Sequence, residues 1–184
     1  MGLQGLSPTI DSLYQEYRQV YPSSPYASAL ADYYQDWQRI GPGQPAPEII
    51  GLNLRGDTIS LSDLRGKLIY VDVWASWCRP CVAEFPYYEE LQNALNEEER
   101  IEFLFVSIDQ ERSDWENVLL GKTPPQGLHI NDLKESEDYG GITSIYNMWG
   151  IPQYLIIDQA GNIVDTKAPP PSSAKIKEVL TRLL

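Results

Sequence analysis

The chain has 184 residues, of which 42% are hydrophobic and 22% are charged, and its formal net charge at pH 7 is −12. This composition is ordinary for a globular protein, and the length allows one domain with an appendage. The acidic balance argues against nucleic acid or an anionic membrane surface as a partner, because both are bound by basic patches.

The sequence shows neither a membrane-spanning segment nor a signal peptide. Its apolar runs are shorter than the roughly 20 residues that a spanning helix needs. The N-terminus has no apolar core segment and no positive charge before Arg18. We therefore expect either a cytoplasmic protein or a mature or recombinant fragment of a longer one.

Residues 1–40 are predicted to form a helical hairpin. Ser7 and Pro8 are typical of a helix start, and the prolines of residues 22–25 separate two stripes of apolar residues at helical spacing. The stripes consist of Ile10, Leu13, Tyr14, Tyr17 and Val20, then Tyr26, Leu30, Tyr33, Tyr34, Trp37 and Ile40. We interpret both as packing surface. Residues 41–47 are predicted to be a linker, since three prolines and two glycines disfavour a helix or a central strand.

Residues 48–184 are predicted to form one α/β domain with a mixed central sheet flanked by helices. Strands are predicted as a hairpin within 48–61, as buried strands at 68–74 and 101–108, and as a hairpin of 154–157 with 163–164. The two buried strands are apolar on both faces, which is typical of central strands covered on both sides. The closing hairpin makes the sheet mixed.

The helices of this domain follow from their caps and spacing. One buried helix face is predicted from five residues at helical spacing: Cys81, Phe85, Tyr88, Leu91 and Leu95. A short helix is predicted to open at residues 113–116, another to occupy 142–149, and a last one to be capped by Ser172 or Ser173. Residues 121–141 are predicted to be mostly loop.

Two cysteines, Cys78 and Cys81, are separated by two residues. A disulfide-stapled scaffold needs more cysteines that are farther apart. A zinc site is nearly excluded, because the single histidine, His129, lies far away in sequence and is given no role. Redox chemistry is the favoured use of the pair, although the motif alone leaves a structural thiol pair or a single-turn staple open.

The position of the pair suits thiol–disulfide exchange. Cys78 is predicted at a helix N-terminus, where free N–H groups, the helix dipole and neighbouring Arg79 stabilise a thiolate and should depress the thiol pKa. Cys81 lies about one turn further on and points inward. Cys78 is therefore the expected nucleophile, and Cys81 is expected to attack the mixed disulfide and release the substrate.

The motifs around the pair resemble those of the thioredoxin superfamily. Residues 71–81, VDVWASWCRPC, resemble its active-site segment. Residues 45–48 with 61–67, residues 84–86, and residues 150–153 with 157–161 resemble its TlpA/ResA-like branch. The resemblance spans roughly residues 44–184. It implies a thioredoxin-like fold and thiol–disulfide oxidoreductase activity through a redox-active Cys78–Cys81 disulfide, with no further cofactor and no metal.

The resemblance also implies roles for residues distant from the cysteines. Ile151 and Pro152 match a cis-proline loop, in which the backbone at Ile151 pairs with the substrate and Pro152 leaves the sulfur face open. Asp72 matches a buried acid that relays the proton of Cys81, and burial should raise its pKa. The alternative for Asp72 is a carboxylate at the strand edge paired with Lys67.

The expected site also includes Glu84, Trp77, Arg79 and Pro80. Glu84 matches a glutamate that tunes the cysteine pair, although an acid near a helix N-terminus is favourable in any case. Trp77, Arg79 and Pro80 are expected to contact the substrate. Arg79 departs from the residues common in these relatives, so the resemblance does not predict the reduction potential. It also leaves open whether Asp72 or Glu84 accepts the proton.

We expect a reductase of protein disulfides in the bacterial cell envelope or periplasm, supplied by an upstream thiol reductant. Contact with a membrane is expected only through a segment absent from this chain, and residues 1–40 are expected to be the remnant of a longer chain. The alternatives are a thiol peroxidase, which needs a lone peroxidatic cysteine, a copper carrier, which separates its cysteines by three residues, and a binding module without activity. The substrate, the direction of electron flow, the role of residues 1–40 and the oligomeric state stay open.

Overall fold

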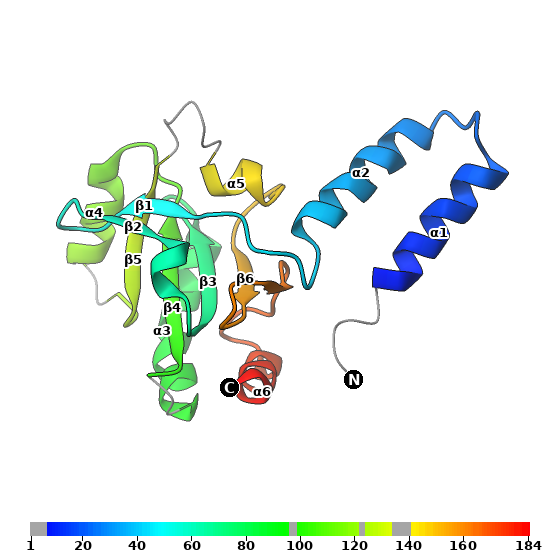
Figure 1. Cartoon of the computed structure of the whole chain (residues 1–184). Coiled ribbons are helices and arrows are strands. Elements are labelled where there is room, and N and C mark those ends of the chain that lie inside the picture. Colours follow the sequence, from blue (N-terminus) through cyan, green and yellow to red (C-terminus); the bar gives the residue numbers. More distant parts are fainter. Residues whose placement is uncertain (1–6, 96–98, 122–123, 134–140) are drawn as a thin grey trace.

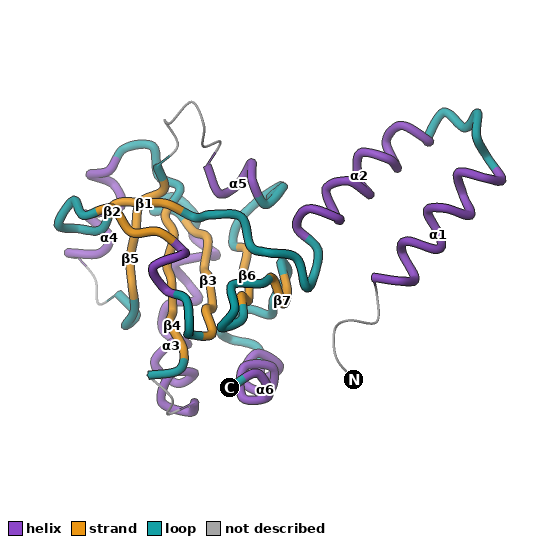
Figure 2. The backbone as a smooth tube through the Cα atoms, in the orientation of Figure 1, coloured by secondary structure: helices purple, strands orange, loops and turns teal. Residues whose placement is uncertain are grey.

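The computed structural model describes residues 7–95, 99–121, 124–133 and 141–184. In chain order its elements are α1 (Ser7–Val20), α2 (Ala27–Ile40), β1 (Ile50–Leu52), β2 (Thr58–Ser60), the 3₁₀ helix η2 (Leu61–Leu64), β3 (Leu68–Trp74), α3 (Arg79–Leu95), β4 (Ile101–Ser107), α4 (Arg112–Gly121), β5 (Leu128–Asp132), α5 (Gly141–Ile145), β6 (Gln153–Ile157), β7 (Ile163–Asp165) and α6 (Ala174–Leu183). Figures 1 and 2 show one sheet with helices packed around it and the two N-terminal helices to one side.

The seven strands form a single sheet in the order β2-β1-β5-β4-β3-β6-β7. β4 pairs in parallel with β3 and with β5, whereas β6 and the outer strands pair antiparallel. The predicted α/β class with a mixed sheet is therefore confirmed. β3 lies near the middle of the sheet, and every one of its residues is buried.

The two faces of the sheet carry separate hydrophobic clusters, and β3 contributes alternate residues to each. Leu68, Tyr70 and Trp74 face a cluster that includes side chains of α3, α4 and α6, while Ile69, Val71 and Val73 face a cluster that includes η2 and α5. This alternation is the pattern of a central strand covered on both sides. The five predicted core residues of α3, from Cys81 to Leu95, are all buried.

The prediction that residues 121–141 are mostly loop is wrong for residues 128–132, which form β5. Leu128–Asp132 pairs with both β4 and β1, with Ile130 fully buried between them. The segment is short and half polar, so its own preference for a strand is weak and the pairing of its backbone decides its structure. The predicted helix at 142–149 is also shorter, because Asn147 adopts a left-handed conformation with φ 49° soon after α5 ends. Residues 122–123 and 134–140 of the predicted loop lie outside the described residues.

α1 and α2 form the predicted hairpin beside the domain (Figure 1). Their described contact is a stack of Tyr14 on Tyr34, with ring centroids 3.9 Å apart, and the Tyr34 hydroxyl donates to the Asp11 carboxylate. Other stripe residues, Leu13 and Tyr33 among them, are exposed, so the stripes are packing surface only in part. The side chains of Ser7, Pro8, Ile10 and Trp37 lie outside the described residues.

The segment between the hairpin and the domain runs along the outer edge of β7. Gly43 N donates to Ile163 O at 2.7 Å, Ile163 N donates to Gln44 O at 2.8 Å, and Ala46 N donates to Gly161 O at 2.9 Å. The predicted linker is thus bonded to the sheet through its backbone. Among the helices in the described ranges, none combines the length and apolar character needed to cross a bilayer.

Candidate active site

The cysteine pair lies at the junction between β3 and α3. β3 ends at Trp74 and α3 begins at Arg79, so Cys78 directly precedes the helix and Cys81 lies in its first turn. The two sulfurs form a disulfide, and the Cys81 backbone N–H donates to Cys78 Sγ at 3.3 Å. Cys78 is 5% exposed, whereas Cys81 is fully buried. Cys78 is therefore the sulfur that an outside group can reach, and amide hydrogens at the helix start point toward it.

The loop before the cysteines is anchored by Asp109, a residue that is not among those predicted from the sequence. Both carboxylate oxygens of Asp109 accept the Ser76 N–H, at 2.9 and 3.1 Å, and Oδ1 also accepts the Ser76 hydroxyl at 2.7 Å. The Ser107 hydroxyl donates to Oδ2 at 2.7 Å. Asp109 is buried, so this network fixes the chain two residues before Cys78. The one sequence signal was an acid directly after a buried strand.

Asp72 is a buried carboxylate under α3. It is 1% exposed, and its Oδ2 accepts the Tyr88 hydroxyl at 2.7 Å, while Oδ1 has no partner among the described residues. Burial raises the pKa of Asp72 to about 7, the hydrogen bond from Tyr88 opposes this rise, and the negative charge of Glu84 adds to it. Lys67 pairs with Glu102 at 2.9 Å, so the alternative pairing with Lys67 is wrong.

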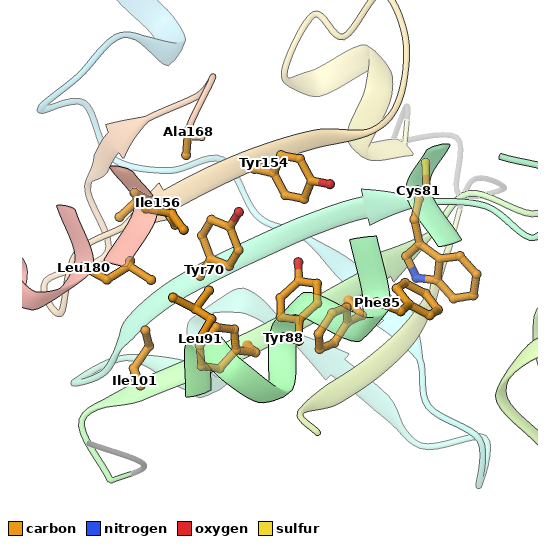
Figure 3. Close-up of a cluster of buried hydrophobic side chains, with 14 of the residues drawn as sticks. Tyr70, Cys81, Phe85, Tyr88, Leu91, Ile101, Tyr154, Ile156, Ala168 and Leu180 are labelled. Carbon is orange, nitrogen blue, oxygen red and sulfur yellow. The ribbon is translucent and has the colours of Figure 1, made fainter. Parts of the chain in front are cut away.

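Tyrosines surround Asp72 on this face of the sheet. Tyr70 stacks on Tyr154 with ring centroids 5.7 Å apart, and the Tyr70 hydroxyl donates to Pro169 O at 2.7 Å. Burial first, and then the charge of Asp72, raise the phenol pKa of both Tyr70 and Tyr154. Figure 3 shows Tyr70, Tyr88 and Tyr154 grouped over β3, with Cys81 further along the same cluster.

Glu84 lies on α3 but is bonded away from Asp72. Its carboxylate accepts the Ser172 N–H at 2.9 Å and the Ser172 hydroxyl at 3.0 Å, and so ties α3 to the segment before α6. Asp72 and Glu84 are thus held by different partners, Tyr88 and Ser172 respectively.

A cleft beside the cysteines brings together several predicted site residues. It has a volume of about 410 Å³, and its lining includes Pro80, Glu84, Pro152, Gln153, Tyr154 and Lys167. The Ile151–Pro152 peptide bond is cis, and Ile151 packs against the cluster that contains both cysteines. Trp77 is 65% exposed and Arg79 is exposed. The predicted site residues therefore lie at or beside the first turns of α3, except Asp72, which lies under the helix at Tyr88.

His129 lies apart from this site. It falls in the stretch predicted as mostly loop, but it lies in β5, between β1 and β4, and its ring stacks on Phe105 with centroids 4.5 Å apart. Burial lowers its pKa. Within the described ranges, no group of three or more His, Cys, Asp or Glu side chains is arranged to hold a metal ion.

The sheet order, the flanking helices and the cysteine pair at the start of α3 define a thioredoxin-fold protein. The profile of the Redoxin family matches residues 41–181. The chain therefore belongs to the Redoxin family.

Named relatives refine this placement. The chain is 26% identical over 132 residues to the thiol-disulfide oxidoreductase ResA of Geobacillus kaustophilus, which covers 72% of each sequence. It is 32% identical over 124 residues to the thioredoxin-like protein YneN of Bacillus subtilis, covering 67% of this chain and 69% of YneN. The crystal structure of a candidate thiol-disulfide oxidoreductase from Bacteroides vulgatus superposes with a TM-score of 0.69 at 34% identity, covering 79% of this chain and 99% of that one. The ResA/TlpA-like resemblance is confirmed.

Proposed function

We propose that this protein is a thiol–disulfide oxidoreductase that exchanges disulfides with protein substrates through Cys78 and Cys81. The observation that carries the proposal is the Cys78–Cys81 disulfide at the start of α3, with the less buried sulfur preceding the helix. The thiol-disulfide oxidoreductases among its relatives support the proposal.

The reaction follows from the different exposure of the two sulfurs. In the reduced protein the Cys78 thiolate attacks a substrate disulfide, forms a mixed disulfide and expels the first substrate sulfur as a thiolate. The Cys81 thiol then loses its proton and attacks Cys78 Sγ, which expels the second substrate sulfur and leaves the Cys78–Cys81 disulfide. The substrate gains two electrons and the protein loses two. A thiol reductant restores the dithiol by the reverse chemistry.

Asp72 is the proposed acceptor of the Cys81 proton. Tyr88 and Cys81 lie on the same buried face of α3, and the Tyr88 hydroxyl contacts Asp72. The carboxylate thus lies under the helix face that carries the attacking thiol. A pKa of about 7 suits a base that must both take and return a proton near neutral pH. Glu84 is assigned a tuning role, because its negative charge raises the pKa of Asp72.

The substrate is proposed to bind across the open end of α3. Trp77, Arg79 and Pro80 are exposed there, and Pro152 lines the adjoining cleft. The backbone at Ile151 is proposed to pair with the substrate chain, as the ResA/TlpA-like resemblance implies. The same resemblance supports a place in the bacterial cell envelope, with an upstream thiol reductant as partner.

Reduction of insulin by dithiothreitol tests the proposed function. Catalytic amounts of the protein are expected to accelerate the reaction by about tenfold or more, because a thiolate favoured by a helix start reacts faster than a free thiol near neutral pH. Turbidity of the released insulin chain gives the rate, and the Cys78→Ser/Cys81→Ser double variant is the control. A wild-type rate equal to that of the control would overturn the proposal, and faster turnover of peroxide than of insulin would favour the peroxidase alternative.

Glu84→Gln is expected to slow insulin reduction at neutral pH by less than about threefold, whereas Asp72→Asn slows it by more than about tenfold. Both carboxylate oxygens of Glu84 already accept hydrogen bonds from Ser172. Oδ1 of Asp72 accepts none from the described residues, so it is available to a proton. The two variants are compared in the same assay, after circular dichroism has shown that both are folded. The opposite order of effects would assign proton transfer to Glu84.

A further inference from the structure

The two oxygens of Asp72 have different surroundings. Oδ2 accepts the Tyr88 hydroxyl at 2.7 Å, and no hydrogen bond to Oδ1 exists within the described part of the chain. A phenol hydroxyl donates one hydrogen bond, so the contact occupies one carboxylate oxygen and leaves the other available. The contact also restricts rotation of the carboxylate, because Tyr88 is itself fully buried and its ring packs edge-on against Phe103 and Phe105.

Tyr88, which contacts Asp72, and Cys81 lie on one helix. They are seven residues apart on α3, about two turns, so their side chains project from the same face. Asp72 and Trp74 project from the same face of β3, and Trp74 belongs to the cluster that contains Cys81 and Tyr88. The hydroxyl that holds the carboxylate and the thiol that would use it are therefore carried by the same face of one helix.

We propose that Tyr88 is a positioning residue for disulfide exchange: its hydroxyl holds Oδ2 of Asp72, so that Oδ1 is the oxygen that exchanges a proton with Cys81. This inference rests on the proposed function and deepens it. When Cys81 attacks Cys78, the proton leaves Cys81 Sγ for Oδ1, and it returns when a reductant reopens the disulfide. Tyr88 keeps its own proton throughout, because burial raises its pKa well above the ordinary value.

The hydroxyl also keeps the carboxylate usable as a base. The titratable groups that shift the pKa of Asp72 are Tyr88 and Glu84 from α3. Tyr70 from its own strand and Tyr154 from β6 also lie near its charge, but their raised pKa values keep both phenols neutral near pH 7, so neither changes charge in this range. None of these side chains is a cation. With no cation among them, the hydrogen bond from Tyr88 is the interaction that opposes the rise in the pKa of Asp72 caused by burial. Loss of this hydrogen bond would leave Asp72 protonated over more of the neutral range.

Tyr70 supplies a matched control on the same face. It is as deeply buried as Tyr88, and its hydroxyl also makes one hydrogen bond, but the acceptor is Pro169 O. Tyr70→Phe therefore removes an equivalent buried hydroxyl without removing a bond to Asp72. An effect that Tyr88→Phe shows and Tyr70→Phe lacks is specific to the contact with Asp72.

The test follows both steps of exchange with dithiobis(nitrobenzoate), an aromatic disulfide that releases a coloured thiolate at each step. Stopped-flow mixing with the reduced protein resolves a first phase for Cys78 attack and a second for Cys81 attack. Tyr88→Phe is expected to move the pH midpoint of the second phase upward, so that this phase is about tenfold slower below the wild-type midpoint, while the first phase keeps its rate. Tyr70→Phe is expected to leave both phases unchanged.

The outcomes separate this role from the proposed function. A wild type that releases only one thiolate per protein would contradict the proposed function itself. A wild type with two phases, combined with an unshifted second phase in Tyr88→Phe, would overturn only the role of Tyr88, and so would an equal shift in Tyr70→Phe. If Tyr88→Phe does not fold, carbon NMR of the oxidised wild type decides. The hydroxyl-bearing carbon of Tyr88 is expected to titrate with the Asp72 carboxyl at one midpoint, and separate midpoints would overturn the proposal.

Discussion

Cys81→Ser is expected to accumulate a covalent mixed disulfide between Cys78 and the substrate, whereas Cys78→Ser is expected to accumulate none. Cys78 retains some exposure and receives an amide hydrogen bond at the helix start, while Cys81 is fully buried behind it. Without Cys81 the first exchange proceeds and the second has no attacking sulfur. Turnover of insulin in both variants is expected to fall to the uncatalysed level.

Non-reducing gels and mass spectrometry detect the trapped species. Serine is nearly the size of cysteine, so each variant preserves the packing around the site, and the double variant gives the background of adventitious disulfides. Trapping by Cys78→Ser in place of Cys81→Ser would reverse the assigned roles. Equal trapping by both would mean that the two sulfurs are equally accessible, contrary to their exposure in the structure.

Asp72→Asn is expected to stabilise the oxidised protein at alkaline pH. Burial raises the pKa of Asp72 from 3.8 to about 7, so the folded protein binds this proton more tightly than the unfolded chain. The stability gained from that proton is fully present below about pH 4 and is lost as the pH rises through about 7. Over this pH range the free energy of unfolding falls by on the order of 4 kcal/mol. An asparagine avoids it but buries an unpaired amide group at a cost of about 1–3 kcal/mol.

The net expectation is a gain of about 2 kcal/mol in the free energy of unfolding near pH 8.5, and no gain below about pH 4. Denaturant titrations of both oxidised proteins across this range measure the difference. A difference that does not change with pH would contradict the raised pKa of Asp72. The same substitution is expected to slow exchange, so Asp72 would be retained for its chemistry at the expense of stability.

The fold class and the redox pair could be predicted because their signals are local. Two strands apolar on both faces, a closing hairpin and a cysteine pair at a helix start each occupy one short stretch of sequence. β5 could not be predicted, since its five residues have weak strand preference and adopt their structure between two neighbours distant in sequence.

The residues that support the site could not be predicted from the sequence, for a related reason. Asp109 bonds Ser76 across 33 residues, and Tyr88 bonds Asp72 across 16. Tyr88 was predicted as part of an apolar helix face, and it is buried there, but helical spacing does not show that its hydroxyl meets the one carboxylate of β3. Such partners are set by the packing of a helix on a sheet, which a local pattern does not encode.

The backbone bonds between residues 43–46 and β7 bear on where the catalytic unit begins. A strand at the end of a sheet exposes unpaired N–H and C=O groups that can pair with another molecule. Gly43, Gln44 and Ala46 occupy that position on β7, and the match to the Redoxin family begins at residue 41. The segment thus pairs with backbone groups of Gly161 and Ile163 that would otherwise be open to another molecule. A domain cut after residue 47 would lose these three backbone hydrogen bonds, whereas one cut after residue 40 would keep them.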